Sequence, residues 1–429
     1  MRRSGKLLPI LAIALFACSA TGDSSRESNR DSDAGTGTGG AGGQGFDDGF
    51  DGDASNDPGP ALATLRGRVY APNGELPISG ALVYLTKDMP PEIPDGAYCD
   101  KCVELGSGTP HTFSAPSGQF ELPVHQTGEY HLVVQKGQFR RVRAIEVVEG
   151  VQEVDKEKTT FPSKTLKPFD TIPKMAIVTG QWDAVDLTLA KLGLASTTTN
   201  FLGQEEVDRT QPYGFDYIEG FAATEFMKNP AQMAKYHIVF KPCSETEDTP
   251  DGLTCKPFMA DDPAVQNALR DYVAAGGKLY ATDYSYEYVR RSWPGFITWQ
   301  GETNQTGSAC SGGGSNGPAE VPDPGMGSWL EALGHKDWDI QAAWTGLQKV
   351  SPMQGTDPDG QPATITPKVW VKSKASGRPA TVSFESGCGR VMYSTYHTEA
   401  GKSETIPQQM ALLYVLLEVG VCVKPPVVK

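Results

Sequence analysis

The sequence predicts two folded parts of different class: an antiparallel β-sandwich, followed by an α/β doubly wound domain with a mostly parallel sheet. Residues 62–150 consist of short runs with alternating apolar and polar side chains between Gly- and Asn-containing turns, which is typical of antiparallel strands. From residue 173 onward, short apolar runs alternate with segments of helical spacing, which favours a parallel sheet with helices on both faces. The length of 429 residues suits two such domains.

The amino terminus has the pattern of a secretory signal. Arg2, Arg3 and Lys6 precede an apolar run over residues 7–17, which is shorter than the roughly 20 residues of a membrane-spanning helix. The run ends directly before Cys18 in a stretch that resembles a bacterial lipobox, and the resemblance implies cleavage before Cys18 and lipid on its thiol. The alternative is an ordinary signal peptide that is cut elsewhere. We expect the signal to be removed and the lipid to anchor the protein in a membrane.

Net charge and export limit the possible partners. Removal of the three positive charges in the signal changes the formal net charge from −14 to −17. A chain this acidic is repelled by phosphates, which argues against a nucleic-acid partner and leaves the lipid as the contact with the membrane. The residue after the lipidated cysteine is Ser19, not the Asp that favours retention in the inner membrane. By analogy with this sorting signal, we expect the protein in the outer membrane of a bacterial cell envelope.

Residues 18–60 are predicted to be a flexible tether. The segment consists mostly of Ser, Gly, Asp and Asn and has too few apolar side chains to form a core. Its acidic stretch at residues 47–53 suggests a calcium loop, but it lacks the ligand spacing and the distal Glu of an EF-hand. A solvated spacer is therefore expected.

Residues 61–155 carry the strands of the predicted sandwich. The stretches 67–69, 78–83, 117–122 and 128–130 resemble the carboxypeptidase regulatory-like domain, a transthyretin-like β-sandwich. This resemblance implies an accessory or structural part without catalysis. The predicted strands are residues 64–70, 81–85, 118–124, 128–134 and 143–148.

The second domain is expected at residues 173–424, after a charged, proline-containing linker at 156–172. Gly-, Pro- and Asn-rich residues at about 300–365 predict a long irregular insertion with one short helix near residues 329–333. The other predicted elements are strands 175–178, 238–240 and 278–282, helices 183–192 and 263–275, a hairpin of strands 380–384 and 390–394, and a closing amphipathic helix at 408–419.

Three stretches of this domain, residues 236–240, 269–279 and 389–397, resemble the class I glutamine amidotransferase-like fold and its ThuA-like relatives. The resemblance implies a flavodoxin-like sheet with active-site residues beyond its strands. His397 and Glu399 match the His-x-Glu of the amidotransferases, in which the histidine activates a cysteine nucleophile and the glutamate orients the histidine.

The nucleophile of that family is not matched. It should lie on a tight turn after strand 278–282, but residues 283–285 (Asp-Tyr-Ser) provide neither a cysteine nor the glycines that such a turn requires. Cys243, at the end of the preceding strand, is the remaining candidate, and in an oxidising compartment we expect it to be bridged. His397 is then interpreted as a structural histidine at a strand end.

Export places the cysteines in an oxidising compartment. Seven remain after lipidation of the first, an odd number, so one of them has no predictable partner. The CxxC motif at residues 99–102 could hold zinc with His111, but no second ligand pair lies near it and a local disulfide is expected instead. The predicted pairs are Cys99 with Cys102 and Cys243 with Cys255, followed by Cys388 with Cys422 or with Cys310.

Aromatic side chains gather near the strand ends at which an open parallel sheet binds its ligands. Aromatic rings beside polar groups suit glycan or peptide recognition, and the alternative is that half of them pack under the insertion. Oxygen-bearing side chains in residues 283–287 also suggest a site for a hard cation, but integrin-type sites follow the first strand of their domain. The candidate binding residues are Asp283, Tyr284, Tyr286, Trp293, Trp299 and Trp182.

We therefore expect a non-catalytic envelope lipoprotein that binds a protein or glycan partner and needs no cofactor or metal. The alternative is an exported hydrolase that uses His397 and Glu399 with Cys243 or with a metal-bound water. A free Cys243 thiol within reach of His397 favours the hydrolase, whereas a Cys243–Cys255 disulfide excludes the cysteine-dependent version.

Overall fold

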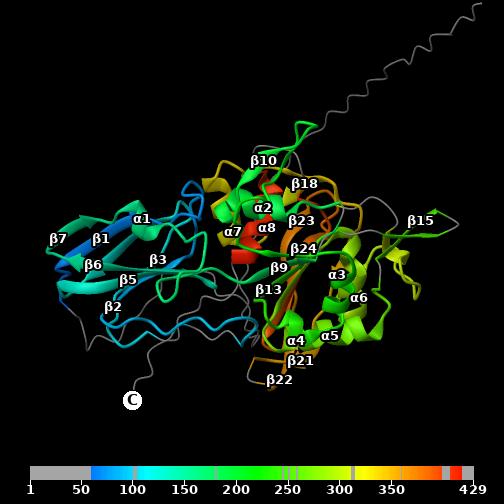
Figure 1. The fold of residues 1–429 in the computed structure, drawn as a ribbon, viewed down its shortest axis with the longest axis horizontal. Helices are drawn as coiled ribbons and strands as arrows, with labels where there is room; N and C mark the ends of the chain where they lie inside the picture. The colour runs from blue at the N-terminus through cyan, green and yellow to red at the C-terminus, as the bar shows by residue number, and fades with distance from the viewer. Residues whose placement is uncertain are drawn as a thin grey trace, which may run out of the picture. The chain divides into compact units, whose positions relative to one another are not determined.

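The computed structural model describes residues 59–99, 103, 105–178, 180, 182–243, 246–249, 252–257, 259–310, 315–358, 360–398 and 406–417 (Figure 1). The predicted signal, Cys18 and residues 18–58 of the predicted tether lie outside the described residues. None of the helices in the described ranges is long and apolar enough to cross a membrane.

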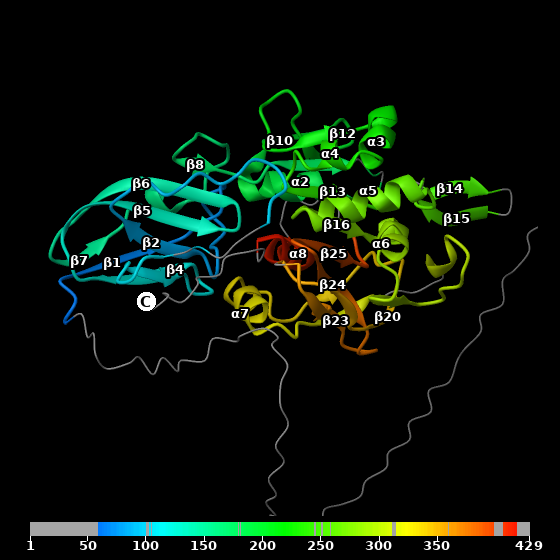
Figure 2. The same cartoon turned by 90° about the horizontal axis from the view of Figure 1, so that it is seen from below.

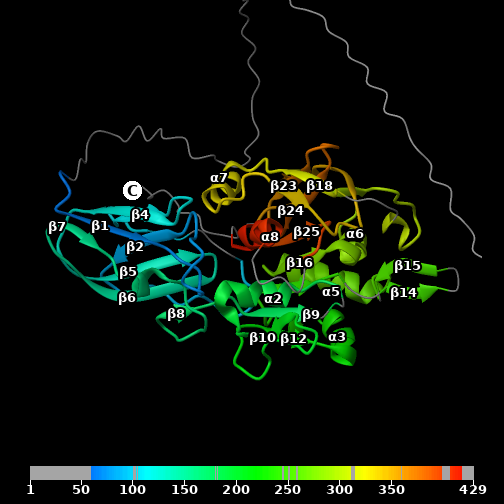
Figure 3. The same ribbon diagram turned by 90° about the horizontal axis from the view of Figure 1, so that it is seen from above.

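Two sheets share one core in the first half of the chain. A three-stranded sheet has the order β4-β1-β7, and a five-stranded antiparallel sheet has the order β3-β2-β5-β6-β8. Figures 2 and 3 show the strands of these sheets in two layers, and Leu122 of one layer belongs to the same buried cluster as Leu132 of the other. The five strands predicted in this region correspond to β1, β2, β4, β5 and β6. The bounds are β1 (Ala63–Arg68), β2 (Leu82–Thr86), β3 (His111–Phe113), β4 (Gln119–Val124), β5 (Gly128–Lys136), β6 (Phe139–Val147), β7 (Gly150–Glu153) and β8 (Asp170–Thr171).

The segment predicted as a linker, residues 156–172, folds against these sheets. It contains helix α1 (Lys156–Thr159) and strand β8, which pairs with β6. Asp170 accepts hydrogen bonds from two nitrogens of Arg143 at 2.8 Å each and is 6% exposed. Because the carboxylate of Asp170 is buried against strand β6, this segment is a part of the folded unit.

A mixed sheet of nine strands among the described residues forms the second half. Its order is β12-β9-β13-β16-β25-β24-β23-β18-β19, and the first five strands are parallel to one another. The pairs from β25 to β19 are antiparallel. The sheet is therefore mixed, and the prediction that it is mostly parallel does not hold for these strands. The bounds are β9 (Met175–Val178), β12 (Asp216–Ile218), β13 (Ile238–Lys241), β16 (Lys278–Thr282), β18 (Gly317–Glu320), β19 (Asp339–Ile340), β23 (Lys368–Ser373), β24 (Pro379–Ser386) and β25 (Gly389–Ser394).

Helices cover both faces of the parallel strands. Successive residues of β13 point to opposite faces, and accordingly Phe240 packs in one core cluster and Val239 in the other. The first cluster contains residues of α2 and α8, and the second contains residues of α3, α5 and α6. The helix bounds are α2 (Val185–Leu189), α3 (Gly220–Met227), α4 (Pro230–Met233), α5 (Pro263–Ala274), α6 (Tyr286–Ser292), α7 (Pro324–Ala332) and α8 (Pro407–Leu417).

Helix α8 is buried at residues 408–417, although its sequence predicts an amphipathic helix. Leu412 and Leu416 line a small apolar cavity with Phe240 of the sheet, whereas the ring of Tyr414 lies 5.5 Å from that of Trp329 in α7. The helix thus lies between the sheet and α7 (Figure 3), which leaves it no solvent face.

The region predicted as an irregular insertion contains regular structure. Helix α7 includes the predicted short helix, and Asp323 caps its first turn by accepting a hydrogen bond from Met326 N at 2.7 Å. Strands β18 and β19 extend the large sheet, which gives the region a structural role. The smaller hairpins and pairs of the second half are β10 (Thr197–Thr199) with β11 (Glu205–Val207), β14 (Thr246–Thr249) with β15 (Gly252–Pro257), β17 (Ile297–Trp299) with β20 (Leu347–Val350), and β21 (Met353–Thr356) with β22 (Pro362–Ile365).

A disulfide joins Cys99 to Cys388, across 289 positions of the sequence. The prediction that Cys99 pairs with Cys102 is therefore wrong; Cys102 and Cys422 lie outside the described residues. The chain before Cys99 runs along the second half, where Pro94 O contacts His237 Nε2 at 2.8 Å, and this path brings Cys99 to the β24–β25 turn.

Candidate functional site

Three neighbouring strand ends bring Cys243, Asp283 and His397 together. Strands β13, β16 and β25 are adjacent and parallel, so the residues that follow them meet at one edge of the sheet. One ligand-type atom from each of the three side chains lies within 4.8 Å of the other two. Two of the three predicted catalytic residues are thus in contact range, and Glu399 lies outside the described residues.

Asp283 occupies a tight turn between strand β16 and helix α6. Its φ of 40° is in the left-handed region, which costs a non-glycine residue about 1–3 kcal/mol and is concentrated at functional sites. Two hydrogen bonds fix the turn: Tyr393 Oη donates to Asp283 O at 2.8 Å, and Ser285 Oγ donates to Pro242 O at 2.7 Å. The expectation that such an elbow requires glycines is therefore wrong here, because Asp tolerates this conformation and the surroundings hold it.

His397 lies against the Asp283 carboxylate. Its Nε2 is 2.9 Å from Asp283 Oδ2, an ion-pair distance. The backbone of His397 is held on both sides, since its N–H donates to Ala342 O at 3.3 Å and its carbonyl accepts from Gln408 Nε2 at 2.5 Å. Burial lowers the pKa of His397, but the contacts with Asp283 and Cys243 and the charge of Asp183 outweigh burial and raise this pKa to about 11.

Asp183 is a second buried carboxyl beside the histidine, and its oxygens are occupied. Oδ2 accepts from Thr282 Oγ1 at 2.5 Å, and Oδ1 accepts from Thr398 N at 2.7 Å and from Thr398 Oγ1. Burial raises the pKa of Asp183, while the His397 charge and these hydrogen bonds oppose that rise. Asp183 therefore holds the chain at Thr282, directly before Asp283, and at Thr398, directly after His397.

Cys243 is a free, fully buried cysteine, so the predicted Cys243–Cys255 disulfide is wrong. Its thiol lies with the Asp283 and His397 side chains in the cluster. Burial raises the pKa of the Cys243 thiol, and the contact with His397 only partly offsets this effect. Burial therefore disfavours the thiolate, which is the nucleophilic form of this side chain.

Most of the predicted aromatic binding residues are in the core. Tyr286, Trp293 and Trp299 are 0%, 6% and 2% exposed, and Tyr284 is partly buried. The ring of Trp299 packs 5.3 Å from that of Tyr286. Packing under the insertion, the alternative interpretation, is correct for these three rings.

Two tryptophans beside the cluster are exposed. Trp182 is 59% exposed, and its backbone N–H donates to Cys243 O at 3.4 Å. Trp344 is 56% exposed, and its backbone N–H donates to Asp283 Oδ2 at 3.3 Å. The sequence pattern indicates Trp182, but it gives no sign of Trp344, because no strand or motif indicates where the loop of Trp344 lies.

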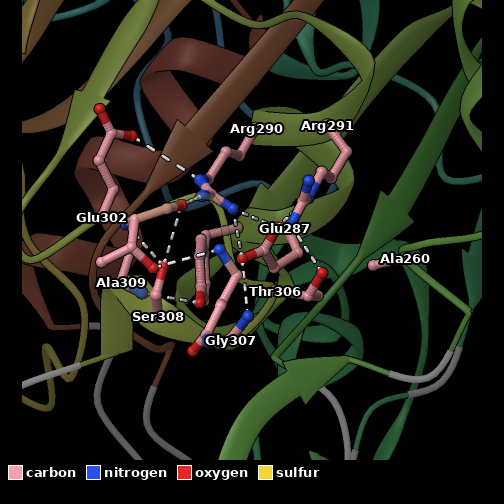
Figure 4. Close-up of polar contacts among 12 residues, drawn as sticks. Ala260, Glu287, Arg290, Arg291, Glu302, Thr306, Gly307, Ser308 and Ala309 are labelled. Atoms are coloured by element: carbon pink, nitrogen blue, oxygen red, sulfur yellow. Dashed lines mark hydrogen bonds and ion pairs between the residues drawn. The ribbon is translucent and has the colours of Figure 1, made fainter.

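A buried acid next to the elbow ties the following loop to α6. Figure 4 shows Glu287 between Arg290 and Arg291, which it contacts at 2.9 and 3.1 Å. Glu287 Oε1 also accepts from Gly307 N at 2.9 Å, and Arg291 donates to Thr306 Oγ1 at 2.6 Å. The loop at residues 302–309 is thereby fastened to the helix that begins at the elbow.

Comparison with known proteins found no matching family model and no matching curated protein. Solved structures with a local likeness include a protein described as ThuA-like from Bacteroides uniformis, with 12% identity and a TM-score of 0.31 over 57% of this chain and 89% of that one. The cytoplasmic protein STM3548 from Salmonella typhimurium gives 11% identity and a TM-score of 0.31 over 58% and 98% of the two chains.

A third similar structure is a GH42 β-galactosidase from G. stearothermophilus, at 11% identity and a TM-score of 0.27 over 58% of this chain. The present chain spans 30% of the length of that enzyme. Because the TM-scores of all three are 0.31 or lower, the description of the fold rests on the sheet topology and that of the site on its own contacts.

Proposed function

We propose that this chain is a lipid-anchored protein of the bacterial cell envelope that binds a glycan at the carboxyl edge of its large sheet. The observation that carries the proposal is the pair of exposed tryptophans, Trp182 and Trp344, whose backbones are fixed to Cys243 and Asp283. Large exposed aromatic rings beside polar groups are suited to stacking on sugar faces.

The proposal includes an amidotransferase-like, ThuA-like fold for the second half and a regulatory-like β-sandwich for the first half. The parallel order β12-β9-β13-β16-β25, the positive φ of Asp283 and the position of His397 support this assignment of the second half. The two-layered sheets of residues 63–171 support the sandwich as a spacer between the anchor and the site.

The test uses the full chain produced with its signal in a bacterial host. Wild-type protein is expected in the membrane fraction and Cys18→Ser in the soluble fraction, because the variant lacks the lipidated thiol. Detergent-extracted protein is then titrated with soluble oligomers of glucose, galactose and N-acetylglucosamine, and binding is followed by tryptophan fluorescence and calorimetry.

Trp182→Ala and Trp344→Ala are each expected to weaken binding of the best oligosaccharide by at least about tenfold, the effect of removing an aromatic anchor. Phe201→Ala is the matched control, since Phe201 is 95% exposed in the β10–β11 turn. An equal loss in the control, or no response to any oligosaccharide, would refute glycan binding. Membrane association of Cys18→Ser would refute the anchor.

The second candidate is the hydrolase, because Cys243 is free and lies beside His397 as that hypothesis requires. A cysteine nucleophile must be a thiolate, however, and burial raises the pKa of Cys243. We expect Cys243 in the native protein to resist iodoacetamide at pH 8 and to react fully after unfolding, as measured by peptide mass spectrometry. Rapid native labelling of Cys243 would instead support the hydrolase.

A further inference from the structure

We propose that Cys243, Asp283 and His397 bind one divalent metal ion of the zinc class. This site is independent of the proposed glycan binding, because neither exposed tryptophan side chain is a member of it. The inference rests on the ligand types, their spacing, and one buried oxygen, Asp283 Oδ1, that accepts no hydrogen bond from the described residues.

The ligand types favour zinc over calcium or magnesium. Thiolate, imidazole and carboxylate are the three groups that bind Zn²⁺ in proteins, whereas Ca²⁺ and Mg²⁺ prefer oxygen ligands alone. Zinc-to-ligand bonds of about 2.0–2.3 Å place tetrahedral ligands roughly 3.5 Å apart. The three candidate atoms lie within 4.8 Å of one another, so small side-chain rotations suffice to close the site.

One carboxylate oxygen of the cluster is buried without a hydrogen-bond partner. Within the described residues, Asp283 Oδ1 accepts no hydrogen bond, whereas His397 Nε2 lies 2.9 Å from Asp283 Oδ2. Asp283 is 0% exposed and His397 is 8% exposed, so water does not readily supply the missing partner. An unpaired buried acceptor is unfavourable, and a bound cation would satisfy Asp283 Oδ1.

Charge and rigidity support the same assignment. A thiolate and a carboxylate carry two negative charges, which one divalent ion balances in this buried place. Each ligand is also held by a further contact: Cys243 N donates to Thr282 Oγ1 at 2.9 Å, Asp283 accepts from Trp344 N, and His397 N donates to Ala342 O. Three protein ligands leave a fourth position for water or for an oxygen of a bound molecule.

The test is metal loading of the full chain. Protein stripped with a chelator is incubated with Zn²⁺, dialysed and measured by elemental mass spectrometry, and about one zinc per chain is expected. Loading with Co²⁺ is expected to give a thiolate-to-cobalt charge-transfer band in the near ultraviolet together with the visible bands of a four-coordinate ion.

Cys243→Ser, Asp283→Asn and His397→Gln are each expected to weaken zinc binding at least about tenfold. Cys243→Ser is also expected to abolish the charge-transfer band while visible bands remain at saturating Co²⁺. The control is His111→Gln, which changes an exposed histidine and should leave both readouts unchanged.

Circular dichroism of the metal-free variants shows whether each one folds. If a variant does not fold, the wild-type zinc content and cobalt spectrum decide the question without it. Zinc content near zero in wild-type protein, or a charge-transfer band that persists in folded Cys243→Ser, would overturn the proposal.

Discussion

Replacing Glu287 with alanine is expected to destabilise the protein by about 3–5 kcal/mol, because the change leaves two arginines without their buried counter-charge. The side chain of Glu287 is 0% exposed, and those of Arg290 and Arg291 are 11% and 27% exposed. The variant also loses the acceptor for Gly307 N, one of the contacts that hold the loop to α6. Urea unfolding followed by tryptophan fluorescence measures the change.

The matched control is Glu385→Ala, which removes a similar ion pair from the surface. Glu385 lies 3.2 Å from Arg390, and its side chain is 49% exposed. Exposed pairs contribute about 0–1 kcal/mol, so this variant is expected to unfold close to wild type. Similar midpoints for the Glu287 and Glu385 variants would contradict a buried ion network.

Removal of the Cys99–Cys388 disulfide is expected to cost about 2–5 kcal/mol of stability. The bond closes a loop of 289 positions, and a cross-link over so long a loop strongly restricts the unfolded chain. The double variant Cys99→Ser/Cys388→Ser tests this expectation by urea unfolding under non-reducing conditions.

Peptide mapping of the wild-type protein should recover a cross-linked pair of peptides that contain Cys99 and Cys388. A mild reductant that lowers the unfolding midpoint of wild-type protein should have a much smaller effect on the double variant. Recovery of a Cys99–Cys102 peptide instead would show that the long-range bond does not form.

Local patterns predicted the elements whose signals are contained in a few residues. Strands β9, β13 and β16 are short, fully buried apolar runs, and α5 begins where Asp262 accepts from Ala264 N at 2.8 Å. In the antiparallel part of the sheet, the hairpin pattern predicts β24 and β25, whereas no local pattern indicates β18, β19 or β23. Residues 317–320 (Gly-Pro-Ala-Glu) have no strand pattern, and they become β18 by pairing with β19 and β23.

The sequence predicts those site residues that directly follow a predicted strand. His397 and Cys243 were found because the residues after parallel strands share one edge. The left-handed turn at Asp283 was missed because contacts from Tyr393 and Pro242, which are remote in sequence, stabilise it in place of glycines. Trp344 reaches the cluster through a main-chain hydrogen bond, for which side-chain patterns carry no signal.

The complete burial of α8 has a consequence for biosynthesis. This helix follows every strand of the large sheet in the chain, yet Leu412 and Leu416 cover apolar residues of its central strands. A chain that emerges from its amino end exposes that apolar face until the last described helix has been delivered. If the protein is exported as proposed, the second half can therefore complete its folding only after residues 407–417 have crossed the membrane.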